Sequence, residues 1–199
     1  MVEFKSSKTR LNLARAFAGE CQDGAKYQFL AKQAEKEGYA YLKTLFKTHA
    51  KNEMAHAKKF FDLIAEYSDE KNKNIDISGG YAFCKGDLLT SIQDTINVED
   101  SQSTVVYPDF AKEAEDEGYP DIAKAFRFAG TVENCHKLLL EQVLEQLQND
   151  TMYSKKQPTK WKCSNCGFEH TDKDCWDVCP SCDMGQGYAE IKIDMNSGD

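Results

Sequence analysis

Apolar residues recur at steps of three and four along most of the first 150 residues, which is the periodicity of amphipathic helices. Four such segments follow one another, with apolar positions that include Leu13, Phe17, Tyr27 and Leu30, then Leu42, Phe46, Phe60 and Leu63, then Leu88, Ile92, Ile96 and Phe110, and finally Ile122, Phe126, Leu140 and Leu147. The breaks between them fall at Gly38, in the stretch 71–86 and at Gly118. We therefore predict an all-α four-helix bundle, built from two helical hairpins that a longer crossover joins.

The two predicted hairpins repeat each other. The string AKQAEKEGY at 31–39 matches AKEAEDEGY at 111–119, an offset of 80 residues. The same offset carries Tyr27 onto Tyr107, Glu53 onto Glu133 and His56 onto His136. A common type of helix end could explain the matching glycines, but not a Glu and a His that recur in step. The repeat predicts a pseudo-twofold bundle with one site shared between its halves.

Each half of the repeat carries one Glu-x-x-His motif. A step of three residues puts carboxylate and imidazole on one helix face, and here that face is the apolar one. The first and third helices add Glu20 and Glu99 on their apolar stripes. Four buried carboxylates require positive charge between them, which two metal ions would supply. One Glu from each of two helices and Glu-x-x-His from each of the others is the ligand set typical of ferritin-like di-iron and di-manganese proteins. The predicted ligands and catalytic residues are Glu20, Glu53, His56, Glu99, Glu133 and His136.

Glu99 breaks the symmetry of this set. Strict 80-residue symmetry maps Glu20 onto Asp100 rather than onto Glu99. Either the third helix contains a one-residue bulge of the π type, which is frequent at functional sites, or Asp100 is the ligand.

The C-terminal part of the chain is rich in cysteine. Residues 151–160 are polar, contain Pro158 and lack periodicity, so we predict a linker between a bundle at 1–150 and a small domain at 161–199. That domain is too short to build a core without a metal or disulfides. Two Cys-x-x-Cys knuckles can close a tetrahedral site of four sulfurs, and the motif alone suits zinc and iron equally. The ligands are Cys163, Cys166, Cys179 and Cys182, which leaves Cys21, Cys84, Cys135 and Cys175 as predicted free thiols.

Composition narrows the choice of partners. The net charge is −8 and no basic patch is present, which argues against nucleic acid and anionic membranes. No stretch approaches the ~20 apolar residues of a membrane span, and the N-terminus lacks the apolar run of a signal peptide. We therefore expect a soluble, cytoplasmic protein.

Along nearly its whole length, the chain resembles the rubrerythrins. The residues that carry the resemblance are AFAGE at 16–20, Tyr27, NEMAHA at 52–57, YPDFAKEAEDEGY at 107–119, Glu133 and His136, TKWKCSNCG at 159–167 and CPSC at 179–182. The resemblance implies a di-iron bundle followed by a rubredoxin-like β domain with one Fe(SCys)4 iron, and so favours iron over zinc. It implies that the six carboxylate and histidine residues hold the di-iron centre, that the four knuckle cysteines hold the single iron, and that Tyr27 and Tyr107 support carboxylates.

The activity that this resemblance implies is the reduction of hydrogen peroxide to water in oxidative-stress protection. Electrons would arrive through the rubredoxin-like iron from an NAD(P)H-linked reductase or a rubredoxin, within a head-to-tail homodimer. The alternatives are an O2 reductase, a ferroxidase or iron-handling protein, and a redox sensor. A fused electron-transfer domain favours the peroxide reductase, because iron storage needs no dedicated electron donor.

Gln102 departs from the family pattern. The family has a further glutamate at this position, three residues after the one matched by Glu99. There it binds one iron in the oxidised state, and the histidine matching His56 replaces it on reduction. Because an amide cannot be an anionic ligand, we predict that His56 binds iron in both redox states.

Overall fold

The computed structural model describes residues 2–68, 74–83 and 85–194. After the short 3-10 turn η1 (Phe4–Ser6), helix α1 (Lys8–Lys36) begins where the Ser7 hydroxyl accepts a hydrogen bond from the backbone N–H of Arg10. Gly38, at a φ of 87°, turns the chain into the antiparallel helix α2 (Ala40–Tyr67). These two helices form the first hairpin.

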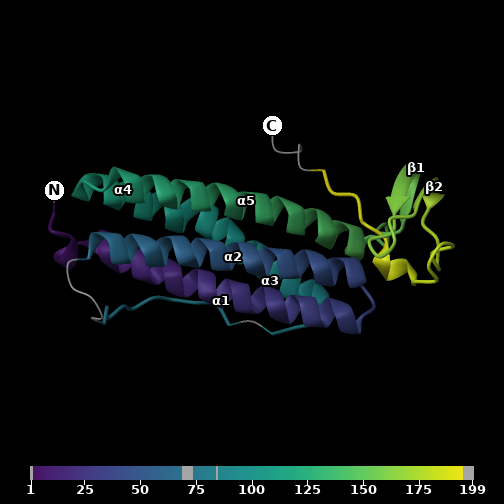
Figure 1. The fold of residues 1–199 in the computed structure, drawn as a ribbon, viewed down its shortest axis with the longest axis horizontal. Helices are drawn as coiled ribbons and strands as arrows, with labels where there is room; N and C mark the ends of the chain where they lie inside the picture. Colours follow the sequence, from purple (N-terminus) through teal and green to yellow (C-terminus); the bar gives the residue numbers. More distant parts are fainter. Residues whose placement is uncertain (1, 69–73, 84, 195–199) are drawn as a thin grey trace.

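The second hairpin repeats this arrangement with one interruption. Helix α3 (Leu88–Ser101) passes through the π-helical segment η2 (Gln102–Val106) into helix α4 (Tyr107–Glu117), and Gly118, at a φ of 93°, leads into helix α5 (Pro120–Gln148). Between the hairpins, residues 74–83 run along the outside of the bundle (Figure 1). There Arg15 on α1 donates to the carbonyl of Ser78 at 2.8 Å. The predicted four-helix bundle with a long crossover is therefore confirmed.

The apolar core of the bundle forms two clusters along its axis. One contains Tyr27, Phe46 and Ile92, and the other contains Phe60, Tyr107 and Phe126. None of the helices within the described ranges combines the length and the apolarity needed to cross a membrane.

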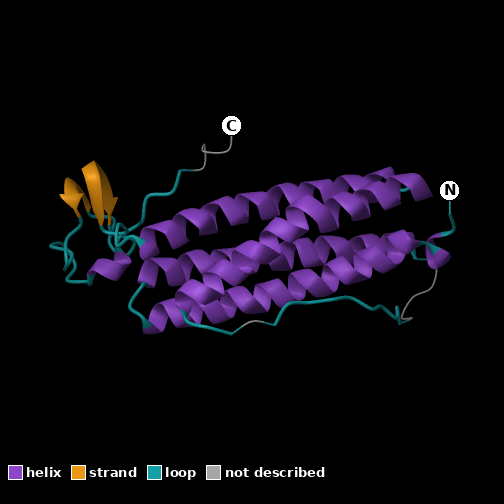
Figure 2. Ribbon diagram, turned by 180° about the vertical axis from the view of Figure 1, so that it is seen from behind, coloured by secondary structure: helices purple, strands orange, loops and turns teal. Residues whose placement is uncertain are grey.

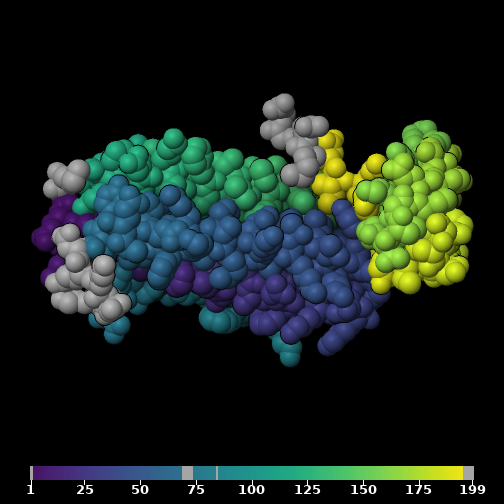
Figure 3. Space-filling model, viewed as in Figure 1, coloured from purple at the N-terminus to yellow at the C-terminus, as the bar shows by residue number. Residues whose placement is uncertain are grey.

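Strands β1 (Ser154–Lys162) and β2 (Glu169–Asp174) pair antiparallel in a small lobe at one end of the bundle, followed by the 3-10 turn η3 (Gln186–Tyr188) (Figures 2 and 3). Most of the stretch 151–160, which the sequence predicts to be a linker, lies in β1, which begins at residue 154. Strand β1 buries one side chain, that of Trp161, and β2 is exposed along its whole length, so the ribbon lacks the apolar alternation that would reveal a strand.

The lobe is packed onto the bundle. Met152 and Ile191 belong to the same apolar cluster as Tyr27 and Phe46. Beyond Ile191, the backbone N–H of Asp194 donates to the side-chain oxygen of Gln142 on α5 at 2.7 Å. The last described residues therefore return along the bundle and fix the lobe to it.

Candidate metal centres

The six predicted ligands converge from four helices on one buried place between the two apolar clusters. Glu20 lies on α1, Glu53 and His56 on α2, Glu99 on α3, and Glu133 and His136 on α5. They form two overlapping groups, each with ligand atoms within 4.8 Å of one another, namely Glu20, Glu53, His56 and Glu133, and Glu53, Glu99, Glu133 and His136. Glu53 and Glu133 belong to both groups, as carboxylates that bridge two metal ions would.

Both imidazoles turn Nδ1 into this cluster. Nδ1 of His56 lies 3.1 Å from Oε1 of Glu133 and 3.4 Å from Oε2 of Glu20. Nδ1 of His136 lies 3.0 Å from Oε1 of Glu53 and 3.0 Å from Oε2 of Glu133. Nδ1 of His56 also lies 3.6 Å from Oε2 of Glu53, so each imidazole faces the carboxylate of its own Glu-x-x-His motif and carboxylates from other helices.

The cluster is short of hydrogen bonds and rich in charge. Buried atoms without a hydrogen-bond partner in the described structure include Oε2 of Glu20, Oε1 of Glu53, Oε2 of Glu99, both carboxylate oxygens of Glu133, and Nδ1 of both histidines. Burial raises the pKa of Glu20 and of Glu99 well above its usual value, and neighbouring carboxylates add to the shift. Unpartnered oxygen and nitrogen atoms around carboxylates that resist ionisation fit a pair of metal cations.

The structure places Glu99, and not Asp100, in the cluster. Glu99 is buried, whereas Asp100 is exposed and forms an ion pair with Lys137 at 3.0 Å. The segment η2 begins three residues later and accommodates the extra residue between Glu99 and Tyr107 relative to Glu20 and Tyr27. A π-helical turn adds one residue without reversing the chain, so it restores the register of the repeat.

Two tyrosines support the carboxylates from opposite hairpins. The hydroxyl of Tyr27 on α1 donates to Oε1 of Glu99 on α3 at 2.5 Å. The hydroxyl of Tyr107 on α4 donates to Oε1 of Glu20 on α1. Both tyrosines are fully buried, so water does not compete for these hydrogen bonds, which fix the orientation of the two carboxylates.

Gln102 forms a hydrogen bond with a residue outside the ligand set. Its amide donates to Oδ2 of Asp23 at 2.8 Å, and Asp23 also pairs with Lys26 at 3.0 Å. This network lines a cavity of about 670 Å³ between α1, α3 and the crossover, to which Gly19 and Tyr107 also contribute.

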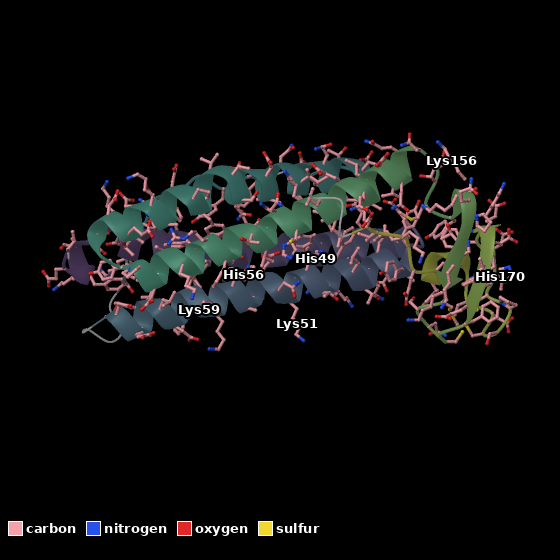
Figure 4. The ribbon with its side chains drawn as sticks, turned by 90° about the horizontal axis from the view of Figure 1, so that it is seen from above. His49, Lys51, His56, Lys59, Lys156 and His170 are labelled. Atoms are coloured by element: carbon pink, nitrogen blue, oxygen red, sulfur yellow. The ribbon has the colours of Figure 1, made fainter. Side chains whose placement is uncertain are left out.

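Sequence reasoning did not identify His49. This buried side chain lies on α2, one turn before Glu53, and its ring stacks on that of His136 at a centroid distance of 4.6 Å. Figure 4 shows His49 and His56 in the middle of the bundle, while Lys51 and Lys59 of the same helix point outward. The sequence gives no spacing pattern for a single histidine on an apolar face, because the residue that His49 contacts, His136, lies on another helix.

The second centre lies in the lobe. The sulfurs of Cys163 and Cys182 are 3.8 Å apart, as are those of Cys166 and Cys179, and all four lie within 4.8 Å of one another. Hydrogen bonds from Met184 and Asn165 lower the pKa of Cys182 to about 7. The four sulfurs fit a tetrahedral metal site.

The remaining thiols stand apart from this group. Cys21, Cys135 and Cys175 form no disulfide, and Cys175 lies in the core of the lobe with Trp161 and Ala189. Cys84 lies outside the described residues.

This combination defines a class of protein: a ferritin-like four-helix bundle with a carboxylate–histidine di-metal site, followed by a two-stranded domain with a four-cysteine knuckle cluster. The rubrerythrin family model matches residues 12–152. The chain is 36% identical to rubrerythrin-1 of Clostridium acetobutylicum over 96% of its own length and 97% of that protein. It is 32% identical to the rubrerythrin of Clostridium perfringens over the same shares. The chain belongs to the rubrerythrin family.

Solved structures share the fold. Nigerythrin in its fully reduced, all-ferrous state matches with a TM-score of 0.60 and 23% identity, over 96% of this chain and 94% of that one. A bacterioferritin from Desulfovibrio desulfuricans matches with a TM-score of 0.59 and 20% identity, over 71% of this chain and 81% of that one.

Proposed function

We propose that this protein reduces hydrogen peroxide to water at a non-haem di-iron site, with electrons relayed through a rubredoxin-like iron. The observation that carries the proposal is the presence in one chain of two different donor sets. The bundle offers buried oxygen and nitrogen atoms, and the lobe offers four thiolates. The first set suits a metal that binds small oxygen species, and the second suits a one-electron carrier.

Iron is the metal that we assign to both sites. Glu20, Glu53, His56, Glu99, Glu133 and His136 would hold the pair, and Cys163, Cys166, Cys179 and Cys182 the single ion. When bound, iron supplies one-electron steps between its ferrous and ferric states, which zinc cannot supply. The all-ferrous nigerythrin structure concerns that protein, and it supports the same metal here.

The exposure of the ligand side chains indicates from which side a substrate would reach the cluster. The side chain of His56 is 19% exposed, whereas those of Glu20, Glu53, Glu133 and His136 are at most 5% exposed. Peroxide would therefore approach from the side of His56. The reaction consumes one H2O2, two electrons and two protons and yields two water molecules. Tyr27 and Tyr107 donate hydrogen bonds to Glu99 and Glu20 and would hold these two carboxylates in place.

The position of the lobe supports a head-to-tail homodimer. His136 lies 12 residues before the end of α5, which is about 18 Å along a helix, and the thiolates lie beyond that end. A second copy with its lobe at the middle of this bundle would shorten the electron path. An external NAD(P)H-linked reductase or a rubredoxin would then reload the thiolate iron.

Stopped-flow mixing of the fully reduced protein with H2O2 or O2 tests the proposal. We expect H2O2 to oxidise the iron–thiolate centre, seen in its visible absorption, in the wild type. In Glu133→Ala the iron–thiolate absorption should respond to H2O2 more slowly, because the variant lacks one of the proposed ligands of the di-iron site. A band that never responds to peroxide would contradict the relay. Faster oxidation by O2 would favour an O2 reductase, and uptake of more than three iron ions per chain would favour iron handling.

A further inference from the structure

His49 is a buried histidine outside the six-residue ligand set. It is 5% exposed and lies one helical turn before Glu53. Its ring is stacked on that of His136 on α5, with an interplanar angle of 27°. The His49 ring also packs edge-on against the ring of Tyr27 on α1, at a centroid distance of 5.3 Å. His49 thus connects the tyrosine that supports Glu99 with the imidazole that faces the same group of ligands.

The nitrogen atoms of these rings lack the usual partners. Within the described structure, neither Nδ1 nor Nε2 of His49 has a hydrogen-bond partner, and the same holds for Nε2 of His136. A metal-binding histidine almost always donates its second N–H to an acceptor that fixes the ring orientation. For His136 no such acceptor is found among the described residues, and the His49 ring, stacked on its face, is the contact that restricts rotation of the imidazole.

The repeat shows that this contact belongs to one half only. Phe46 and Phe126 are matched by the 80-residue offset, and each packs on the tyrosine of its own half, on Tyr27 at 6.5 Å and on Tyr107 at 6.1 Å. The counterpart of His49 is Ala129. The two metal positions therefore have similar ligands but different surroundings.

We propose that His49 is a positioning residue that orients His136 by ring stacking and thereby sets the affinity of the metal position formed with Glu53, Glu99 and Glu133. The position formed with His56 is independent of it. The role extends the metal-binding part of the proposed function and does not depend on peroxide reduction.

Anaerobic titration of the metal-free full-length chain with Co(II) tests this role. The wild type, His49→Ala, His49→Phe and Thr48→Ala are compared, the last being an exposed neighbour on the same helix. The visible absorption of cobalt in the bundle reports the two positions, and sulfur-to-cobalt absorption reports the lobe separately. We expect His49→Ala to lose about tenfold or more in affinity at one bundle position only. His49→Phe keeps a ring for stacking and should retain both affinities, as should Thr48→Ala.

Three results would overturn the role of His49. They are unchanged affinities in His49→Ala, an equal loss at both bundle positions, and a loss in His49→Phe as large as in His49→Ala. Circular dichroism of each metal-free variant shows whether it is folded, and the comparison with His49→Phe holds even if His49→Ala is not. A wild-type bundle that takes up fewer than two cobalt ions would instead overturn the proposed metal site, and the role of His49 with it.

Discussion

Tyr27 donates a hydrogen bond of 2.5 Å to Glu99, 72 residues later in the chain, and joins the first helical hairpin to the second. The hydrogen bond from Tyr107 to Glu20 makes the reverse connection. Each tyrosine therefore supports a carboxylate of the hairpin to which it does not belong. Neither half of the repeat can complete its own site.

Tyr27→Phe and Tyr107→Phe should each lower the free energy of unfolding of the metal-free protein by about 1–3 kcal/mol, because each leaves a buried carboxylate oxygen without its donor. Urea unfolding followed by circular dichroism measures the loss. Tyr81→Phe is the control, since the hydroxyl of Tyr81 donates to the carbonyl of Arg15 at a partly buried place and its loss should cost less. Equal stability of all three variants would contradict this support.

The periodicity and the repeat were sufficient to predict the bundle and the convergence of Glu53, His56, Glu133 and His136. Spacing within a helix fixes which side chains share a face, and two matched motifs imply one shared site. The choice between Glu99 and Asp100 required the structure. A π-helical turn changes which residues face the core, and no particular residue composition marks such a turn in the sequence. Strand β1 was missed because Trp161 is its one buried side chain, which leaves no apolar alternation along the strand. The contacts of His49 and Gln102 with other helices were invisible for a similar reason, since single residues have no spacing pattern.

The stability of the metal-free protein should fall as the pH rises from about 5.5 to about 8.5. Burial raises the pKa of Glu20 and Glu99. Against the effect of burial, the nearby carboxylates of Glu133, Glu20 and Glu53 raise the pKa of His56 to about 12. In each case the folded state binds more protons than the unfolded state, in which the values are 4.5 and 6.5. The stability that these groups contribute is therefore present at low pH. It is lost as the pH rises above about 4.5 for the two glutamates and above about 6.5 for His56.

Thermal unfolding of the metal-free and metal-loaded protein at several pH values checks this prediction. Metal ions displace protons from the ligands, so the stabilisation by metal should grow with pH. Despite the burial of Glu53, His136 and His56 lower its pKa to about 2. Below about pH 4.5 the contribution of Glu53 to stability should therefore decrease as the pH falls. A metal-free protein that becomes more stable between about pH 5.5 and 8.5 would contradict the electrostatics of the cluster.

Gln102→Glu should make the position of His56 depend on the redox state. The wild-type amide donates to the carboxylate of Asp23. A glutamate would be repelled by Asp23 and could become an anionic ligand. Crystal structures of the oxidised and reduced forms should show His56 bound in both states of the wild type and of Gln102→Ala. In Gln102→Glu we expect it to leave in the oxidised state and the rate of peroxide reduction to change. A His56 ring beyond bonding distance in the oxidised wild type would contradict the prediction.

Gly187→Ala should displace the lobe from the bundle. A methyl group at this position would collide with the carbonyl oxygen of Gly38 and lie 3.3 Å from the backbone nitrogen of Ala40, so the turn η3 could not approach the turn between α1 and α2. We expect the variant to bind the same amount of iron, because the ligands of both sites are unchanged. Electron transfer from the thiolate iron to the di-iron site should be slower, because the position of the lobe also sets where it meets the second copy of the proposed head-to-tail dimer. Gly185→Ala is the matched control, since Gly185 has a φ of −64° and a methyl group there would meet no atom within 4 Å. The rate at which peroxide restores the iron–thiolate absorption of the reduced protein measures the effect, and equal rates in the two variants would show that docking of the lobe does not govern the transfer.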